Sequence, residues 1–333
     1  MKTIKTAVIG VGSMGRNHAR VYTELAEAEL LAVADANQDQ ATSIGEKYGV
    51  KGYSDYQQLL EEQKPEAVTI AVPTAMHEEV ATKAMQAGAH VMIEKPIAST
   101  VEEGERLIAL SKELDRKLMV GHIVRFNPAI QALKEKLLAD ELGRIFQILC
   151  RRVGPFPARI RDVGVIVDLA PHDIDIMRYL TGAEPTRVFA ELEKRVHTEH
   201  EDLLLGLLRF ENSITGSLEI NWLTPSKVRE IVVLGERGMF VVNDLTQDLY
   251  FYENAEVGGD LWPVLGTIKG VSEGQMVRYQ VHRYEPLKAE LQAFVTAVAN
   301  DRDVPVSGED GLAALRLALA LIESGQHNQV VEV

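Results

Sequence analysis

Six residues near the start of the chain have the spacing of a phosphate-binding loop. The run Gly10-Val11-Gly12-Ser13-Met14-Gly15 follows a strand-like apolar segment and opens a helical one. Glycines at these positions allow a tight turn and let a pyrophosphate approach the backbone, while the unpaired N–H groups of a helix N-terminus attract its negative charge. We therefore predict that these six residues bind a dinucleotide.

Asp35, at the end of the second strand-like segment, indicates which dinucleotide binds. It follows Gly15 by about 20 residues, where a carboxylate accepts hydrogen bonds from ribose hydroxyls and repels a 2′-phosphate. No Lys or Arg follows it in Ala36-Asn37-Gln38. The expected cofactor is NAD rather than NADP. The alternative is that the glycines only turn a strand into a helix and that Asp35 only caps the strand end.

Two further segments follow strand-like runs, Pro73-Thr74-Ala75-Met76-His77 and Glu94-Lys95-Pro96. The carboxyl ends of parallel strands form the edge where such folds bind ligands. We therefore expect a cofactor-binding set at this edge, made of Pro73, Thr74, His77, Glu94 and Lys95. Lys95 could also stabilise negative charge on a substrate oxygen. The alternative for Lys95 is a solvated surface lysine.

A carboxylate and an imidazole lie four residues apart in the second half of the chain. The segment is Gly164-Val165-Ile166-Val167-Asp168-Leu169-Ala170-Pro171-His172-Asp173-Ile174-Asp175, and we expect Pro171 near the first turn of a helix that ends before Gly182. If the helix has begun by Asp168, the spacing places Asp168 and His172 on one face. The carboxylate would orient the imidazole as a general base. The alternatives are an N-cap at Asp168 and a core histidine at His172.

The first third of the chain alternates strand-like and helical patterns, which predicts a doubly wound parallel sheet of the Rossmann type. The predicted strands are Ala7–Ile9, Leu30–Ala34, Val68–Val72, His90–Ile93 and Leu118–Val120. The predicted helices are Met14–Leu25, Gln38–Tyr48, Met76–Ala87 and Val101–Leu114. We predict an NAD-binding domain over residues 1–121.

The remaining residues, 122–333, predict a substrate-binding and oligomerisation domain of the α+β class. After a helix at Pro128–Asp140, strand-like runs follow one another with few helices between them, which favours an open, mainly antiparallel sheet. These runs are Ile145–Val153, Arg187–Arg195, Leu203–Phe210, Gly216–Trp222 and Val228–Leu234. Helices are predicted at Pro286–Ala299 and Gly308–Ser324.

The composition is that of a folded protein and argues against two classes of partner. Hydrophobic residues make up 46% of the 333 residues, and the formal net charge of −14 repels nucleic acid and anionic lipid. Cys150 is the only cysteine, lies in an apolar run and is expected to be a buried small hydrophobe. A single cysteine, with no signal-like start and no apolar stretch of membrane-spanning length, predicts a cytosolic protein.

Together these segments resemble the glucose-fructose oxidoreductase, inositol dehydrogenase and MocA (Gfo/Idh/MocA) family. The resemblance covers essentially the whole chain and is carried by the glycine loop and by Glu94-Lys95-Pro96, Arg125-Phe126-Asn127-Pro128 and Asp168-x-x-x-His172. One departure is Ala170, where many members have glycine. The resemblance implies a homodimer or homotetramer formed through the C-terminal sheet, and it places Arg125 among the cofactor-binding residues.

The family resemblance also implies a chemistry. Lys95, Asp168 and His172 become a catalytic trio that binds a sugar and oxidises a secondary alcohol by hydride transfer to NAD. His172 would accept the hydroxyl proton and Lys95 would polarise the same oxygen. Asp168 would orient His172 or bond a neighbouring hydroxyl.

Within the family the resemblance is to dehydrogenases of UDP-N-acetylglucosamine and its uronic-acid relatives, which act at C3. It is carried by residues 155–164, by Asn221-Trp222-Leu223-Thr224-Pro225 and by the basic Lys227 and Arg229. Arg159 and Arg161, in a proline-rich loop, are expected to bind the diphosphate, the alternative being a solvated loop. An inositol or free-sugar dehydrogenase and a non-catalytic NAD-binding regulator remain competing interpretations. A metal enzyme using His122 and His172 lacks recognisable zinc spacing, so no metal is expected.

Overall fold

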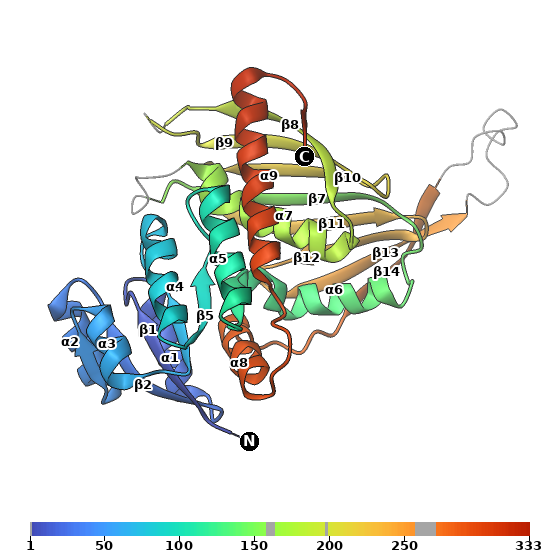
Figure 1. The fold of residues 1–333 in the computed structure, drawn as a ribbon. Helices are drawn as coiled ribbons and strands as arrows, with labels where there is room; N and C mark the ends of the chain where they lie inside the picture. Colours follow the sequence, from blue (N-terminus) through green and yellow to red (C-terminus); the bar gives the residue numbers. More distant parts are fainter. Residues whose placement is uncertain (1, 158–163, 197–198, 257–270) are drawn as a thin grey trace, which may run out of the picture. The chain divides into compact units, whose positions relative to one another are not determined.

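The computed structural model describes residues 2–157, 164–196, 199–256 and 271–333, and the chain divides into two compact units (Figure 1). The first comprises Met1–Phe126 and Tyr284–Arg316, and the second comprises Asn127–Arg283 and Leu317–Val333. The single boundary expected after residue 121 does not describe this arrangement, because residues 284–316 return to the first unit. Helix α8 (Pro286–Ala299) explains the return, since it buries Leu291 and Phe294 and packs on elements of that unit.

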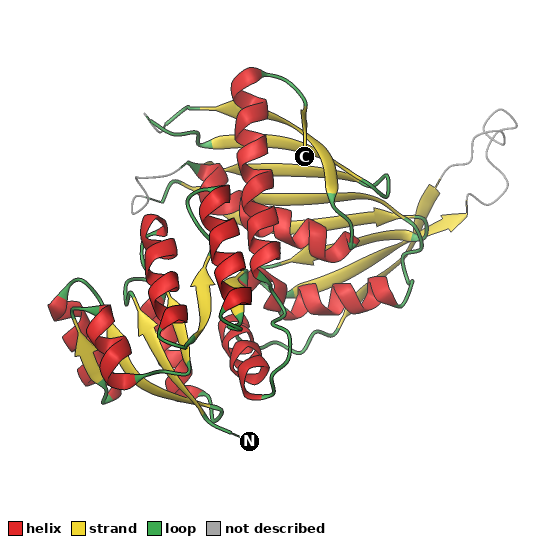
Figure 2. Ribbon diagram, in the orientation of Figure 1, coloured by secondary structure: helices red, strands yellow, loops and turns green. Residues whose placement is uncertain are grey.

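The first unit is a doubly wound parallel sheet, as the sequence predicts (Figure 2). Its strand order is β3-β2-β1-β4-β5-β6, so the order reverses between β1 and β4, the point at which such sheets bind ligands. The strands are β1 (Ile4–Ile9), β2 (Ala28–Ala34), β3 (Lys51–Tyr53), β4 (Ala67–Ile70), β5 (His90–Glu94) and β6 (Leu118–Gly121).

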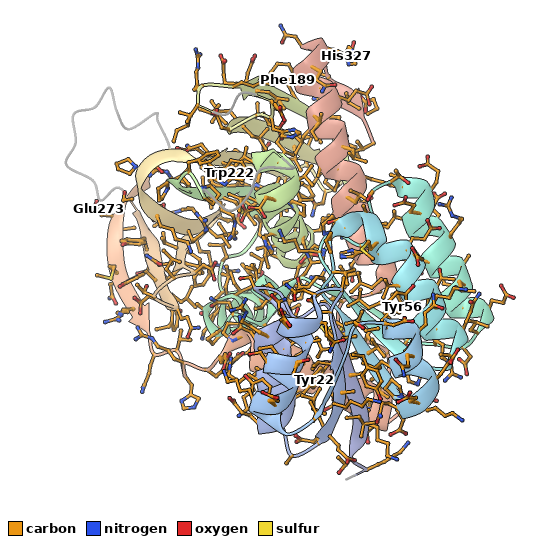
Figure 3. The ribbon with its side chains drawn as sticks, turned by 90° about the vertical axis from the view of Figure 1, so that its left-hand side faces the viewer. Tyr22, Tyr56, Phe189, Trp222, Glu273 and His327 are labelled. Atoms are coloured by element: carbon orange, nitrogen blue, oxygen red, sulfur yellow. The ribbon has the colours of Figure 1, made fainter. Side chains whose placement is uncertain are left out.

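Helices follow most of these strands and bury the sheet between them. They are α1 (Gly15–Glu24), α2 (Gln38–Tyr48), α3 (Tyr56–Gln63), α4 (His77–Gln86) and α5 (Val101–Glu113), with short 3₁₀ turns η1 (Thr74–Met76) and η2 (Ile123–Phe126). Tyr22, labelled in Figure 3, shows how α1 is fixed: its buried hydroxyl lies 2.7 Å from the hydroxyl of Thr69 on β4. This contact fixes the position of α1 on β4.

The second unit contains a nine-stranded, mainly antiparallel sheet in the order β14-β13-β12-β11-β7-β10-β9-β8-β15. Within this sheet, the pair β7 and β10 is the only parallel one among the described residues. The strands are β7 (Ile145–Pro155), β8 (Pro185–Glu193), β9 (Leu203–Phe210), β10 (Thr215–Asn221), β11 (Leu223–Gly235), β12 (Gly238–Asn243), β13 (Asp248–Glu256), β14 (Val271–Tyr279) and β15 (Val331–Glu332).

One face of this sheet carries helices, and the other, called the open face below, is covered by no helix of the described residues. Helices α6 (Pro128–Leu138) and α7 (Val165–Thr181) pack on it, and the last part of α9 (Gly308–His327) packs near Gly206. Strand β9 shows the alternation, because Leu204 and Leu208 are buried whereas Leu205 and Leu207 are half exposed. Cys150 is buried as predicted. No helix in the described ranges is long and apolar enough to cross a membrane.

Candidate active site

The glycine loop between β1 and α1 has the geometry that a pyrophosphate requires. Gly10 has φ +86°, and a Cβ there would lie 2.6 Å from the carbonyl oxygen of Ala71. A Cβ on Gly15 would lie 1.8 Å from the carbonyl oxygen of Gly10, so both positions exclude a side chain. A Cβ on Gly12 would meet no atom within 4 Å, which leaves the backbone open to a ligand at that point.

The start of α1 is suited to an anion. Its N-cap residue Met14 makes no side-chain capping bond within the described part of the chain, and Ser13 and Met14 are exposed. N–H groups at the N-terminus of a helix are then available to phosphate oxygens. The loop therefore fits the dinucleotide predicted from the sequence.

Asp35 is held in place by three hydrogen bonds. Its carboxylate accepts from the backbone N–H groups of Val11 and Asn37, both at 2.9 Å, and from Nε2 of Gln40 at 2.9 Å. An ionised carboxylate has about four acceptor sites, so it can still accept a bond from a ribose hydroxyl. Asp35 thus ties the loop to the end of β2 and presents a fixed negative charge.

His18 and Glu94 form a buried pair beside Lys95. His18, on α1, has no exposed surface, and its Nε2 donates to Oε1 of Glu94 at 2.7 Å. Burial raises the pKa of Glu94, but the interaction with His18 and the charge of Lys95 outweigh it and hold that pKa below its usual value. The pair fixes the end of β5, from which the half-buried Lys95 follows.

His77 lies in the interior of the same edge. Its ring nitrogens lie 2.9 Å from the carbonyl oxygen of Pro96 and 3.0 Å from that of Val72, and burial lowers its pKa. The side chain therefore bridges the segments that follow β4 and β5, and a direct contact of His77 with the cofactor remains a prediction. Pro73 is exposed and Thr74 half buried at the start of η1, so both remain accessible.

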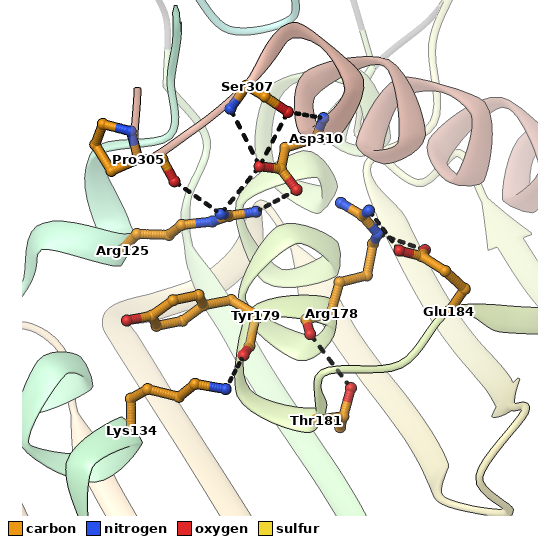
Figure 4. A network of polar contacts seen from close by, with 9 residues as sticks. All are labelled: Arg125, Lys134, Arg178, Tyr179, Thr181, Glu184, Pro305, Ser307 and Asp310. Carbon is orange, nitrogen blue, oxygen red and sulfur yellow. Dashed lines mark hydrogen bonds and ion pairs between the residues drawn. The ribbon is translucent and has the colours of Figure 1, made fainter. Parts of the chain in front are cut away.

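Arg125 is also engaged within the first unit (Figure 4). Its guanidinium contacts both carboxylate oxygens of Asp310, at 3.2 and 3.1 Å, and donates to the carbonyl oxygen of Pro305. Asp310 in turn accepts from the backbone N–H of Ser307 at 3.1 Å. These bonds hold η2 against the start of α9, and a contact of Arg125 with the cofactor remains a prediction.

In the second unit Asp168 and His172 lie on one helix, as their spacing predicts. Helix α7 begins at Val165, so both residues are helical, four apart and half buried. The expectation that Pro171 lies in the first turn was wrong, because it is the seventh residue of the helix. Gly182 ends the helix in the left-handed conformation, as expected.

Glu201 explains why α7 begins early. Its carbonyl oxygen accepts from the backbone N–H of Val165 at 2.9 Å, and its carboxylate accepts from that of Ile166 at 3.3 Å. These bonds satisfy N–H groups that no helical carbonyl can reach, and the negative charge complements the helix dipole. The turn containing Asp168 is thereby stabilised.

A buried ion pair sets the rotation of α7 on the sheet. Nε of Arg152, on β7, lies 2.9 and 2.8 Å from the two carboxylate oxygens of Asp173, and both side chains are buried. Asp244 lies 3.8 Å from the same guanidinium and accepts a hydrogen bond from Asn127. Burial favours neutral Arg152, but the attraction of Asp173 and Asp244 outweighs this and raises its pKa. Because Asp173 points to the sheet, His172 is turned to the side of the helix.

The predicted site residues therefore lie in two groups, one in each unit, and two arginines lie outside the described residues. The first unit brings together the glycine loop, Asp35 and Glu94-Lys95, and the second brings together Asp168 and His172. Arg159 and Arg161 lie outside the described residues. Among the residues that are described, no three His, Cys, Asp or Glu side chains form a group that could hold a metal ion.

The sequence reasoning missed His18 and the charges under α7. The signal for His18 was its place on the buried face of α1, three residues after Gly15 and one turn before Tyr22. Its partner Glu94 is 76 residues away, so the pattern alone could not pair them.

The geometry of Asp35 predicts cofactor selectivity. NAD should bind more than tenfold tighter than NADP, since burying a 2′-phosphate against this carboxylate should cost more than about 1.4 kcal/mol. Asp35→Ser should reduce the ratio of the two affinities. The control Asp39→Ser, which removes an exposed acid on α2, should leave that ratio unchanged. Fluorescence titration of both dinucleotides measures this, and equal affinities for wild type would refute the assignment.

The His18 and Glu94 pair predicts a pH-dependent loss of stability. The lowered pKa means that ionised Glu94 stabilises the fold above the usual carboxyl range and loses this effect as the pH falls through its lowered pKa. Removing the partner of a buried charge, as in His18→Ala, should cost on the order of 3 kcal/mol at pH 7. Without His18, burial raises the pKa of Glu94, so the variant protonates this carboxyl at pH 4 and the cost there should be clearly less.

Urea denaturation at the two pH values tests this expectation. His18→Gln, which keeps an N–H donor, should recover part of the loss at pH 7. If His18→Ala lost the same stability at both pH values, only packing would be involved.

Comparison with known proteins agrees with this geometry. Residues 4–122 match the family described as "Oxidoreductase family, NAD-binding Rossmann fold", and residues 130–241 match the "GFO/IDH/MocA C-terminal domain". The chain is 31% identical over 316 residues to UDP-N-acetylglucosamine 3-dehydrogenase from Acidithiobacillus ferrooxidans, covering 95% of each protein. A solved structure of that enzyme gives a TM-score of 0.86, with 98% of this chain and 99% of that chain covered.

A second relative is an inositol enzyme. Myo-inositol 2-dehydrogenase from Thermotoga maritima is 27% identical, covering 99% of this chain and 98% of its own. Both matches extend over the two units, and the matched N-terminal family is defined by the NAD-binding fold that the glycine loop and Asp35 form here. The chain therefore belongs to the Gfo/Idh/MocA family of NAD-dependent oxidoreductases.

Proposed function

We propose that this dehydrogenase oxidises UDP-N-acetylglucosamine, or its uronic acid, at the 3-hydroxyl to give the 3-keto sugar. The observation that carries the chemistry is the pair Asp168 and His172, fixed on one side of α7 by the buried contact between Arg152 and Asp173. The choice of substrate is supported by the 31% identity to an enzyme named for UDP-N-acetylglucosamine.

Each residue of the proposed trio has a distinct role. His172 accepts the proton of the sugar hydroxyl, and Lys95 donates a hydrogen bond to the same oxygen as negative charge develops on it. Asp168, one turn before His172, orients the imidazole or bonds a neighbouring hydroxyl. NAD, when bound, supplies the hydride acceptor, which takes the hydrogen of the carbinol carbon. The trio is proposed from the sequence pattern and from the local geometry within each unit.

A second candidate is an inositol dehydrogenase. Two inositol enzymes, from Thermotoga maritima and Bacillus subtilis, are 27% and 26% identical and cover 99% of the chain. The predicted contacts of Arg159 and Arg161 with a diphosphate would separate the candidates, because inositol has no such group.

A homo-oligomer and a cytosolic location remain predictions. The oligomer is supported by apolar side chains that line a groove on the open face of the second unit's sheet, including Leu149, Leu205, Leu207 and Val232. An exposed apolar patch on a sheet commonly marks a protein interface.

The proposed trio predicts the effect of two substitutions. His172→Ala and Lys95→Ala should each lower kcat by about a hundredfold or more while NAD affinity stays nearly unchanged, because proton transfer and oxyanion stabilisation have that size. Matched controls are His327→Ala, at the exposed end of α9, and Lys117→Ala, an outer lysine paired with Asp301. Near-normal turnover of His172→Ala across the pH range would place the base elsewhere.

The proposed substrate is tested by NADH formation with a panel of four compounds. These are UDP-N-acetylglucosamine, its uronic acid, free N-acetylglucosamine and myo-inositol, each with and without 2-oxoglutarate in case bound cofactor must be recycled. At least one UDP sugar should be oxidised and free N-acetylglucosamine should be far poorer, since charge-assisted bonds to a diphosphate contribute about 1.5–3 kcal/mol each. Turnover of inositol or the free sugar, with none of either UDP sugar, would reject this substrate and favour the second candidate.

A further inference from the structure

Two arginines face each other across neighbouring strands of the second unit. Arg229 on β11 pairs in register with Arg152 on β7, so their side chains lie on the same face of the sheet. That face is the one on which α7 packs, because Arg152 contacts Asp173 of this helix. Like charges in directly opposed positions repel each other, so this arrangement destabilises the sheet unless both charges are compensated.

Only one of the two arginines is compensated by acids in hydrogen-bonding contact. Arg152 contacts the carboxylate of Asp173 and lies 3.8 Å from that of Asp244. Arg229 instead donates from one terminal nitrogen to two neutral acceptors, the carbonyl oxygens of Val153 at 2.7 Å and Val228 at 2.8 Å. Within the described ranges, no carboxylate lies within the 4.0 Å of an ion pair with Arg229.

The surroundings of Arg229 make its charge unfavourable as it stands. The side chain is half buried, and burial together with the positive charge of Arg152 lowers its pKa to about 10. Its remaining N–H donors, on Nε and on the second terminal nitrogen, make no hydrogen bond to described residues. An anion bound there would offset the repulsion and take up these donors in a two-pronged contact.

Arg229 lies beside the proposed catalytic helix. The charges of Asp173, Asp244 and Asp168 all act on the Arg229 guanidinium, so Asp168 is near Arg229, although no ion pair joins these two described residues. An anionic group bound to Arg229 would thus belong to a molecule that also reaches Asp168 and His172.

We infer that Arg229 is a specificity residue that binds an anionic oxygen group of the substrate, a carboxylate or a phosphate, next to Asp168. The inference rests on the proposed function and deepens it, because it requires the substrate to be charged. The competing explanation is that Arg229 only bridges the carbonyl oxygens of Val153 and Val228. That structural role uses the N–H groups of one terminal nitrogen and involves no ligand.

The test measures anion binding directly, on NAD-saturated enzyme, by titration calorimetry with UDP and with D-glucuronate. Wild type should bind at least one of them, UDP reporting a phosphate site and glucuronate a carboxylate site. Arg229→Gln should raise the dissociation constant at least tenfold, which corresponds to about 1.4 kcal/mol. Arg229→Lys keeps the charge but loses the planar guanidinium, so its dissociation constant should lie between those of wild type and Arg229→Gln.

The matched control is Arg237→Gln. This substitution removes the same charge from the same hairpin, but Arg237 lies at the exposed turn between β11 and β12, where it contacts Asp140. It should bind the ligand as wild type does. Thermal unfolding of each variant checks the fold. If Arg229→Gln does not fold, the dissociation constant of Arg229→Lys is compared with that of wild type instead.

Two results would overturn the inference. One is a wild type that binds neither anion, and the other is an Arg229 variant that binds as tightly as wild type. The substrate panel described above distinguishes a failure of this inference from a failure of the proposed function. Turnover of UDP sugars with unchanged binding by Arg229→Gln rejects only the role of Arg229. Anion binding through Arg229 in an enzyme that oxidises only inositol rejects both the proposed substrate and the substrate role of Arg229, and leaves only an anion site.

Discussion

The contact between Arg152 and Asp173 is the interaction on which the geometry of α7 depends. Burying either charge alone would cost several kcal/mol, so the helix is stable only in the rotation that keeps Asp173 against the sheet. That rotation directs His172, and with it Asp168 one turn earlier, to the side of the helix. The same reasoning applies in the first unit, where buried His18 holds Glu94 and thereby the start of the segment containing Lys95. In both units a carboxylate with a buried hydrogen-bonding partner lies next in sequence to a residue proposed to act on the substrate.

The sequence allowed prediction of those features that depend on neighbours along the chain. The glycine loop, Asp35 and the pairing of Asp168 with His172 are local patterns, and the structure places each in the predicted element. Helices with regular apolar spacing, such as α2 and α8, were predicted to the residue. Strand β3 was not predicted, because three residues containing Gly52 give no alternation to detect.

Features that depend on distant residues could not be predicted in this way. The early start of α7 requires Glu201, which lies 35 residues beyond Ile166 along the chain. The sequence does not reveal this contact, and the preference of proline for the first turn of a helix then places the start of the helix near Pro171. The return of α8 to the first unit follows from the burial of Leu291 and Phe294, and apolar spacing alone does not say which surface will cover them. His77 is a further example: its position after β4 predicts a ligand contact, and the sequence gives no sign that its ring nitrogens lie within hydrogen-bonding distance of two backbone carbonyls.

The degree of compensation separates framework charges from charges available to ligands. Arg152, Asp173 and Glu94 have partners of opposite charge or matching hydrogen bonds, and removing a ligand would not change their balance. Asp35 keeps acceptor capacity after three hydrogen bonds, and Arg229 has only neutral acceptors in hydrogen-bonding contact. A half-buried charge without a counter-ion in contact lowers the stability of the fold. A bound ligand of opposite charge, or one that takes up the remaining hydrogen bonds, removes this destabilisation. By this criterion, Asp35 at the end of β2 and Arg229 in the middle of β11 are charges whose electrostatic balance a bound molecule would complete.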